Sequence, residues 1–159
     1  MNETPQSLAI IAGQADYPLL LARAARARGV ERIVAIAFKG ETDRKIHTVA
    51  DEVIWLHVGS LGALLNALHE SGSKTAVMAG QINPKNLFRV RLDKMLLDLW
   101  KSLPVKNAHT ILGGITAGIE KSGVTVLPAS SFMQDYMPEA GILTHRAPDA
   151  RELNDIQLG

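Results

Sequence analysis

Short apolar runs alternate with amphipathic segments along most of this chain. Four such runs, in which polar residues are few, cover residues 8–12, 33–38, 52–57 and 75–79. Continuous apolar runs of this length are typical of strands in a parallel sheet that is covered on both faces. Each run is followed closely by a glycine, and these are Gly13, Gly40, Gly59 and Gly80. The pattern therefore predicts four strands that each end at a turn.

Helical periodicity fills the spaces between these runs. Leucines recur at helical spacing in residues 61–72, and helices are also predicted over 18–28 and, as a short element, over 42–49. The second half of the chain is more helical. Its predicted helices cover residues 91–103, 107–122, 130–136 and 148–158, with a fifth strand over 124–127 and a short strand or extended segment over 142–144.

Strands that alternate with helices are typical of the α/β class. We expect one Rossmann-like domain over residues 1–159, doubly wound, with a mostly parallel sheet and helices on both faces. With right-handed crossovers, the third, second, first and fourth strands would lie side by side in that order. Gly13 and Gly80 would then face each other across the ligand crevice at the carboxyl ends of the strands.

The loops at this crevice supply the first candidate site. Gly13 allows a tight turn, and Pro18 suits the first turn of the next helix, whose free N–H groups can attract an anion. A phosphate is expected at the amides of Gly13 and Gln14 or at the Gly80 loop. We select Gly13, Gln14, Gly80 and Gln81 as substrate-binding residues, with Lys39 supplying charge.

Several common activities have no motif here. The dinucleotide fingerprint G-x-G-x-x-G is missing, and Lys39 stands where an acidic residue would hold a ribose. No phosphate-binding P-loop and no G-x-S-x-G nucleophile turn is present, and the five histidines show no metal-ligand spacing. Four basic residues near the fourth strand form either a solvated helix face or a basic rim for a phosphate: Lys85, Arg89, Arg91 and Lys94.

Composition narrows the class further. Hydrophobic residues make up 47% of the chain and charged residues 21%, and the net charge of +1 argues against nucleic acid or an acidic membrane as a partner. The absence of cysteine excludes disulfides and thiolate metal sites. No signal peptide or membrane span is predicted, so we expect a cytoplasmic protein with at most peripheral membrane contact. The apolar close of residues 155–159 predicts the front half of a longer protein or a trimmed chain.

Five stretches spread over the chain resemble the N-terminal domain of the LpxI-type UDP-2,3-diacylglucosamine pyrophosphatases. They are Ile10-Ile-Ala-Gly13 with Pro18, Ala35-Ile-Ala-Phe-Lys-Gly40, Gly59-Ser-Leu-Gly-Ala-Leu64, Val77-Met-Ala-Gly80, and Gly141-Ile-Leu-Thr-His-Arg-Ala-Pro148 with Asp155-Ile-Gln-Leu-Gly159. The sequence departs from the family pattern at residues 14–16, 81–83 and 107–109.

The resemblance implies a cytoplasmic enzyme of lipid A synthesis. Such enzymes use Mg²⁺ to hydrolyse the pyrophosphate of UDP-2,3-diacylglucosamine to lipid X and UMP. Their main catalytic acidic residue lies in a C-terminal domain that this chain lacks. The resemblance therefore implies a substrate-holding domain that is inactive alone, with no catalytic residue and no metal ligand assigned here. Its partners would be the lipid-linked UDP-sugar or lipid sugar phosphate and the missing domain, with Thr144 and Arg146 as a second binding patch near that domain.

Two rival functions stay open from the sequence. The first is a non-catalytic module that binds a nucleotide or a sugar phosphate. The second is a fragment of an NAD(P) oxidoreductase. The oligomeric state is also open, with a homodimer among the alternatives.

Overall fold

Five parallel strands form a single sheet in the computed structural model of this chain, which describes residues 4–82 and 92–158. In sheet order the strands are β3 (Glu52–Leu56), β2 (Arg32–Phe38), β1 (Ser7–Ala12), β4 (Thr75–Ala79) and β5 (Thr125–Leu127). All four neighbouring pairs are parallel. The order expected for the first four strands is confirmed. After β3, at one edge of the sheet, the chain crosses over and places β4 on the other side of β1.

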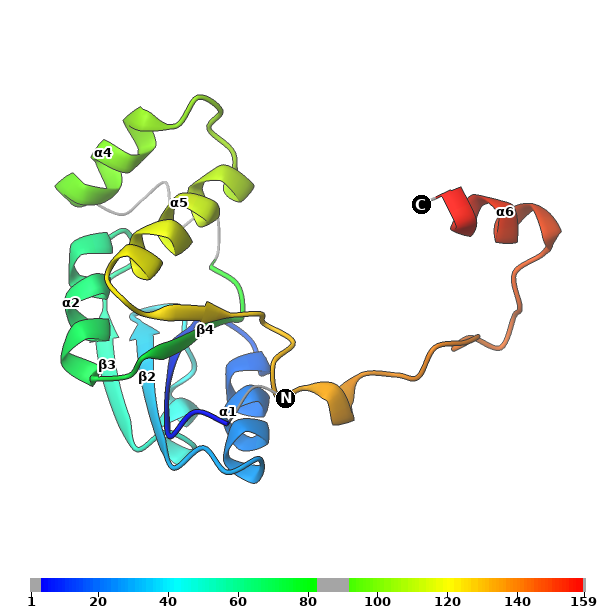
Figure 1. The fold of residues 1–159 in the computed structure, drawn as a ribbon, viewed down its shortest axis with the longest axis horizontal. Helices are drawn as coiled ribbons and strands as arrows, with labels where there is room; N and C mark the ends of the chain where they lie inside the picture. The colour runs from blue at the N-terminus through cyan, green and yellow to red at the C-terminus, as the bar shows by residue number, and fades with distance from the viewer. Residues whose placement is uncertain (1–3, 83–91, 159) are drawn as a thin grey trace.

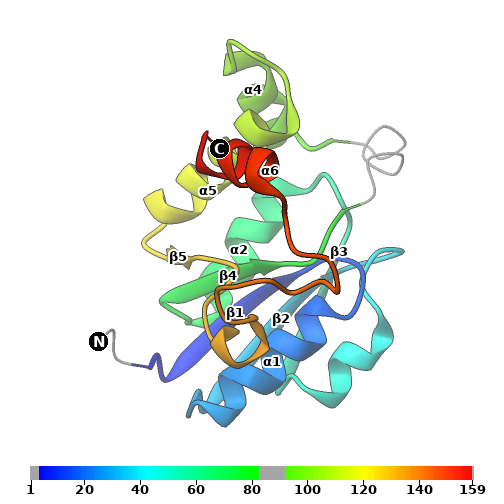
Figure 2. The same ribbon diagram turned by 90° about the vertical axis from the view of Figure 1, so that its right-hand side faces the viewer.

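Helices cover both faces of this sheet, as predicted. One face carries α1 (Tyr17–Ala27) and the 3₁₀ helix η1 (Arg44–Thr48). The other face carries α2 (Leu61–Ser71), α4 (Lys94–Ser102) and α5 (Ala108–Lys121). Figure 2 shows α1 on one side of the strands and α2, α4 and α5 on the other. The α/β, doubly wound and Rossmann-like fold class is therefore confirmed.

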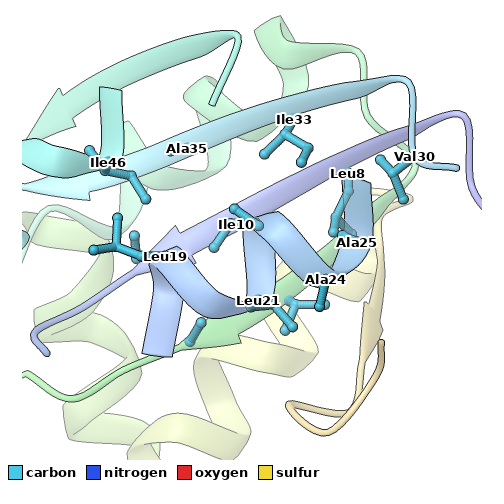
Figure 3. Packing of buried hydrophobic residues seen from close by; sticks show 14 of the residues in the cluster. Leu8, Ile10, Leu19, Leu21, Ala24, Ala25, Val30, Ile33, Ala35 and Ile46 are labelled. Carbon is cyan, nitrogen blue, oxygen red and sulfur yellow. The ribbon is translucent and has the colours of Figure 1, made fainter. Parts of the chain in front are cut away.

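The apolar residues of the central strands fill two separate cores. On the α1 face, Leu8 and Ile10 of β1 are fully buried beneath Leu21, and Figure 3 shows this packing together with Ile33 and Ile46. Successive side chains of a strand point to opposite faces, so the next residues of β1 enter the core under α2 and α5. Because β1 is buried on both faces, it has no polar side chain after its first residue.

Local capping sets several helix ends. Gly72 adopts the left-handed conformation after α2, with a φ of 68°. Asn107 begins α5 through a reciprocal pair of hydrogen bonds with Thr110, the arrangement known as a capping box. Ser60 precedes α2, but its side chain makes no capping hydrogen bond.

Three predicted elements differ from the observed ones. The expected helices over residues 42–49 and 130–136 shorten to η1 and to the 3₁₀ helix η2 (Gln134–Tyr136). Of the two alternatives given for residues 142–144, the strand is not formed: Ile142 and Leu143 are 62% and 69% exposed, and none of the described strands pairs with them. The start of the helix predicted from residue 91 lies outside the described residues, and α4 is described from Lys94.

The C-terminal segment runs away from the sheet and ends in α6 (Ala150–Leu158), as Figure 1 shows. Its hydrogen bonds are local: Asp149 accepts from the amides of Arg151 and Glu152 and so caps the helix. None of the described helices is long and apolar enough to span a bilayer.

Candidate functional site

An apolar cavity of about 470 Å³ lies at the carboxyl ends of β1 and β4. Its walls come from both strands, the ends of β2 and β3, and helices α2, α4 and α5. The lining is formed by Ile11, Gly13, Phe38, Val58, Gly59, Ser60, Leu61, Leu64, Met78, Ala79, Gly80, Gln81, Ile82, Leu96, Ala108, Ile111, Leu112 and Ile115. Among these residues only Ser60 and Gln81 have polar side chains, so the cavity suits a mostly apolar ligand.

Asp93 holds one wall of the cavity in place. One carboxylate oxygen accepts from the Leu96 amide at 2.8 Å and caps α4, while the other accepts from the Gly62 amide at 2.7 Å in the first turn of α2. The amide of Asp93 also donates to the Gly59 carbonyl at 3.0 Å. A single side chain therefore joins the start of α4 to the start of α2.

Helices α4 and α5 approach closely beside the cavity. A Cβ atom at Gly114 of α5 would lie 2.7 Å from a methyl carbon of Leu99 in α4. Glycine at this position allows the leucine to pack directly against the α5 backbone. Ile111 and Ile115 of α5, which lie near Gly114 in sequence, line the cavity wall.

The Gly13 and Gly80 loops meet, as expected, but they leave no gap between them. A Cβ atom at Gly13 would lie 2.4 Å from the Gln81 carbonyl oxygen, and one at Gly80 would lie 2.5 Å from the Gln14 carbonyl oxygen. Gly80 also has a φ of 85°, which glycine adopts without strain. The two loops need glycine because their backbones touch.

The amides of these loops are already paired within the protein. The Gly13 amide donates to the Ala79 carbonyl and the Gln14 amide to the Gln81 carbonyl, both at 2.7 Å. Gln14 and Gln81 form an isolated antiparallel bridge. These two amides are therefore not free to bind a phosphate, and phosphate binding at the Gly80 loop stays a prediction. The open space lies beside the joined loops, in the apolar cavity.

The structure separates the predicted site residues into three places. Gly13, Gly80 and Gln81 line the apolar cavity, whereas Gln14 does not. Lys39 lines a second hollow at the end of β2. Thr144 and Arg146 lie together in the exposed C-terminal segment, where the Thr144 hydroxyl donates to the Arg146 carbonyl at 2.7 Å.

Arg146 is engaged by a neighbour in its own segment. Its guanidinium donates two hydrogen bonds of 2.8 Å to the carboxylate of Glu152. This contact raises the pKa of Arg146 and is the main reason that the pKa of Glu152 is lowered. A phosphate at Arg146 would compete with a bidentate carboxylate.

The described residues were also searched for metal ligands and for the predicted basic rim. Residues 4–82 and 92–158 contain no group of three His, Asp or Glu side chains placed to hold a metal ion. No Mg²⁺ ligand is assigned in that part of the chain. Lys85, Arg89 and Arg91 of the predicted basic rim lie outside the described residues, while Lys94 is exposed at the start of α4.

The pattern of the sequence did not single out Asp93 or the α5 wall. Aspartate directly before a helical apolar repeat is a recognisable capping signal, so Asp93 was identifiable as a helix start. Its second bond, to Gly62, depends on tertiary placement. The apolar repeat of α5 predicts an inward face, but the pattern gives no sign that this face borders a cavity.

Comparison with known proteins identifies a family for this chain. The family model described as the LpxI N-terminal domain matches residues 7–136. No curated protein matches the sequence.

Two of the solved structures that match this chain are of Rhizobium etli pyruvate carboxylase. A variant with the allosteric activator acetyl coenzyme A is 16% identical with a TM-score of 0.49, and 82% of this chain aligns. The complete multifunctional enzyme is 15% identical with a TM-score of 0.48, again over 82% of this chain. The chain spans 12% of the length of each of these proteins.

Proposed function

Because this chain belongs to the LpxI N-terminal domain family, we propose that it is the substrate-holding domain of a cytoplasmic hydrolase of lipid A biosynthesis. The reaction proposed for the whole enzyme is Mg²⁺-dependent cleavage of the pyrophosphate of UDP-2,3-diacylglucosamine, which yields lipid X and UMP. We propose that the bond-breaking step takes place in the C-terminal domain that the family resemblance implies.

The observation that carries this proposal is the apolar cavity at the carboxyl ends of β1 and β4. Its volume of about 470 Å³ falls in the usual range for ligand sites. Each methylene of an acyl chain that leaves water for such a site contributes roughly 0.8 kcal/mol. A cavity with so few polar side chains favours the acyl part of the substrate over its charged part.

The polar side of the same cavity would receive the sugar end of the ligand. Gln81 and Ser60 supply the polar side chains there, beside the joined Gly13 and Gly80 loops. The Gln14–Gln81 bridge keeps these loops together. In this proposal the domain holds the lipid sugar while chemistry takes place elsewhere in the enzyme.

Binding of lipid X to this chain tests the proposal directly. We expect lipid X to bind far more tightly than glucosamine 1-phosphate in calorimetric titrations, since only the former carries acyl chains. Leu112→Lys places a charge at the cavity rim and should weaken lipid X binding about tenfold through lost apolar contact. Leu97→Lys is the matched control, because Leu97 is similarly exposed and does not line the cavity.

Two results would contradict the proposal. Equal affinity for lipid X and glucosamine 1-phosphate would show that the cavity takes no acyl chain. Hydrolysis of UDP-2,3-diacylglucosamine by this chain alone, in the presence of Mg²⁺, would show that the chemistry does not lie elsewhere.

A further inference from the structure

Helix α4 and the loop that leads from it to α5 leave several apolar side chains open to solvent. Met95 and Leu97 flank the buried Leu96 and are 48% and 39% exposed, and Val105 in the loop is 55% exposed. Figures 1 and 2 both show this helix and loop at one end of the molecule, farther from the sheet than α2. Residues 94–106 are called the α4 surface below.

Positive charge accompanies these apolar side chains. Lys94, Lys101 and Lys106 are exposed, and none of the three forms an ion pair with residues 4–82 or 92–158. With Asp98, the three lysines give residues 94–106 a net charge of +2, although the whole chain carries only +1. The near-neutral total, which argued against an acidic membrane as a partner, therefore conceals a local excess of positive charge.

The helical repeat places charge and apolar surface on the same outward side of α4. At about 3.6 residues per turn, Lys94 and Lys101 lie between Met95 and Leu97, on the side opposite the buried Leu96. A lysine in such a position can lay its methylene chain along apolar groups while its ammonium group stays in contact with water or an anion. The outward side of α4 is thus suited to a partner that is apolar inside and anionic at its surface.

Trp100 adds a side chain that is typical of a membrane boundary. It lies on the same helix and is half-buried. A tryptophan ring combines an apolar body with a polar N–H, and such rings are enriched at the level of lipid headgroups. Leu96, on the inward side of α4, lines the apolar cavity, so a bilayer on the outward side would lie beside the cavity wall.

Helix α6 exposes apolar side chains too, but its charge has the opposite sign. Leu153 and Ile156 are 49% and 65% exposed, while residues 150–158 carry a net charge of −1. An anionic surface attracts lysines and repels carboxylates. Charge therefore distinguishes the two exposed apolar helices and favours α4 as the one that meets anionic lipid.

We propose that the α4 surface docks on an anionic lipid bilayer. The exposed apolar side chains enter the headgroup region, and the three lysines contact lipid phosphates. Each lysine close to an anionic surface strengthens such binding roughly fivefold. The inference does not rest on the proposed function, because it is drawn from the outward side of α4 and not from the cavity.

Co-sedimentation of the full chain with vesicles tests the inference. We expect binding to an equal mixture of phosphatidylcholine and phosphatidylglycerol to be at least about tenfold tighter than to phosphatidylcholine alone, and to weaken as salt is added. In a Trp55→Phe background Trp100 is the remaining tryptophan, and its emission should shift to shorter wavelength when the mixed vesicles bind. Equal binding to the two kinds of vesicle would contradict the inference.

A charge series locates the contact. The triple variant Lys94→Gln, Lys101→Gln, Lys106→Gln should bind the mixed vesicles at least about tenfold more weakly than the unaltered chain. A control variant removes the same charge from exposed positions elsewhere: Arg23→Gln, Lys74→Gln and Lys121→Gln. It should change binding by no more than about twofold, because charges away from the contact are screened by salt. Equal losses in the two triple variants would mean that only net charge matters.

An apolar pair supplies the second arm of the test. Met95→Ser with Leu97→Ser should weaken vesicle binding about tenfold without lowering the melting temperature, since both side chains are already exposed. Ile142→Ser with Leu143→Ser, at exposed positions of the C-terminal segment, should leave binding unchanged. Absence of binding to the mixed vesicles would overturn the inference. So would a change of oligomeric state in the Met95, Leu97 variant with vesicle binding intact, because the α4 surface would then contact a second copy of the chain.

Discussion

At the scale of single residues, Asp51 joins three segments of the chain. Its carboxylate accepts a hydrogen bond of 2.7 Å from the Ile33 amide and forms an ion pair with Arg26. The hydrogen bond from the Ile33 amide is the main reason that the pKa of Asp51 is lowered from its usual 3.8, and the Arg26 guanidinium lowers it further. The carboxylate therefore stabilises the fold in its charged form.

Replacement of Asp51 by asparagine should produce an acid-sensitive loss of stability. The lowered pKa in the folded state contributes stability that is present above the unfolded pKa and is lost as the pH falls through the folded pKa. Because the group is half exposed, we expect Asp51→Asn to cost less than about 1 kcal/mol at pH 7. The difference from the unaltered chain should shrink towards zero below the usual pKa of 3.8. Urea unfolding at several pH values measures this, and a difference that does not change with pH would contradict it.

Thr42 ties the loop after β2 to the end of β1 through two buried hydrogen bonds. Thr42→Val keeps the shape of the side chain but leaves the Phe38 amide and the Ala12 carbonyl without their partner. Since a buried unpaired polar group costs roughly 1–3 kcal/mol, we expect a loss of about 2–4 kcal/mol in the free energy of unfolding. Thr48→Val is the control, because the Thr48 hydroxyl makes an exposed bond, and it should change stability by no more than about 0.5 kcal/mol. Equal effects of the two variants would show that Thr42 is not a structural tie.

The residue scale also shows what sequence reasoning cannot reach. Gly13 and Gly80 were identified because glycine after a strand is a strong turn signal. Buried backbone groups must find hydrogen-bond partners, and the amides of Gly13 and Gln14 found theirs at the last residue of β4 and just after it. That pairing depends on the distance between two loops far apart in sequence, which no local pattern encodes.

At the scale of elements, the periodicity of apolar residues predicts the helices but not the cavity that α2, α4 and α5 line. The apolar stripe of α5 predicts an inward face, and Ile119 is indeed fully buried. Nearer the start of the same helix, Leu112 lines the cavity and is 53% exposed. One apolar stripe thus contributes to the core at one end of α5 and to the wall of the cavity at the other.

Alanine substitutions at two adjacent glycines of α5, Gly113 and Gly114, distinguish the effect of helix propensity from that of packing against α4. A Cβ atom at Gly113 meets nothing within 4 Å, so Gly113→Ala should stabilise the protein by about 0.5–1 kcal/mol. Gly114→Ala brings the same propensity but forces Leu99 of α4 to move, since its methyl lies 2.7 Å from the added atom. We expect thermal unfolding to show a gain for Gly113→Ala and none for Gly114→Ala. A similar gain in both variants would mean that α4 does not rest on α5 at this point.

At the scale of the whole molecule, the fold follows from the sequence far more closely than the site does. Short apolar strands, alternating helices and right-handed crossovers leave few arrangements, and the strand order of the first four strands is the expected one. No comparable rule predicts which cavity each candidate site residue lines. Lys39 follows the last residue of β2, and alternation along the strand directs it away from the face that Phe38 shares with the apolar cavity.

The C-terminal segment, residues 138–158, also shows that a local apolar pattern does not by itself determine structure. Residues 142–144 are apolar enough to predict a strand, but a strand needs a neighbour, and none is offered. Thr144 and Arg146 therefore lie in a segment whose hydrogen bonds are internal. Residues 138–158 make no hydrogen bond or ion pair with residues 4–82 or 92–136.

Removal of residues 138–159 should consequently leave the melting temperature within about 2 °C of the full chain, because almost no buried area or hydrogen bonding is lost. Removal of residues 128–159 is the informative control. It also deletes Met133, which is 4% exposed in the α1-side core, and the Arg28–Asp135 ion pair. Loss of that buried methionine should cost about 2–5 kcal/mol and lower the melting temperature clearly.

The shorter truncation also decides between the candidate binding residues. If the apolar cavity alone holds the lipid sugar, a chain ending at residue 137 should bind lipid X as tightly as the full chain. If Thr144 and Arg146 contribute, as the family resemblance implies, affinity should fall while the melting temperature stays constant. Calorimetry on the two chains separates these outcomes, since stability and binding then depend on different parts of the molecule.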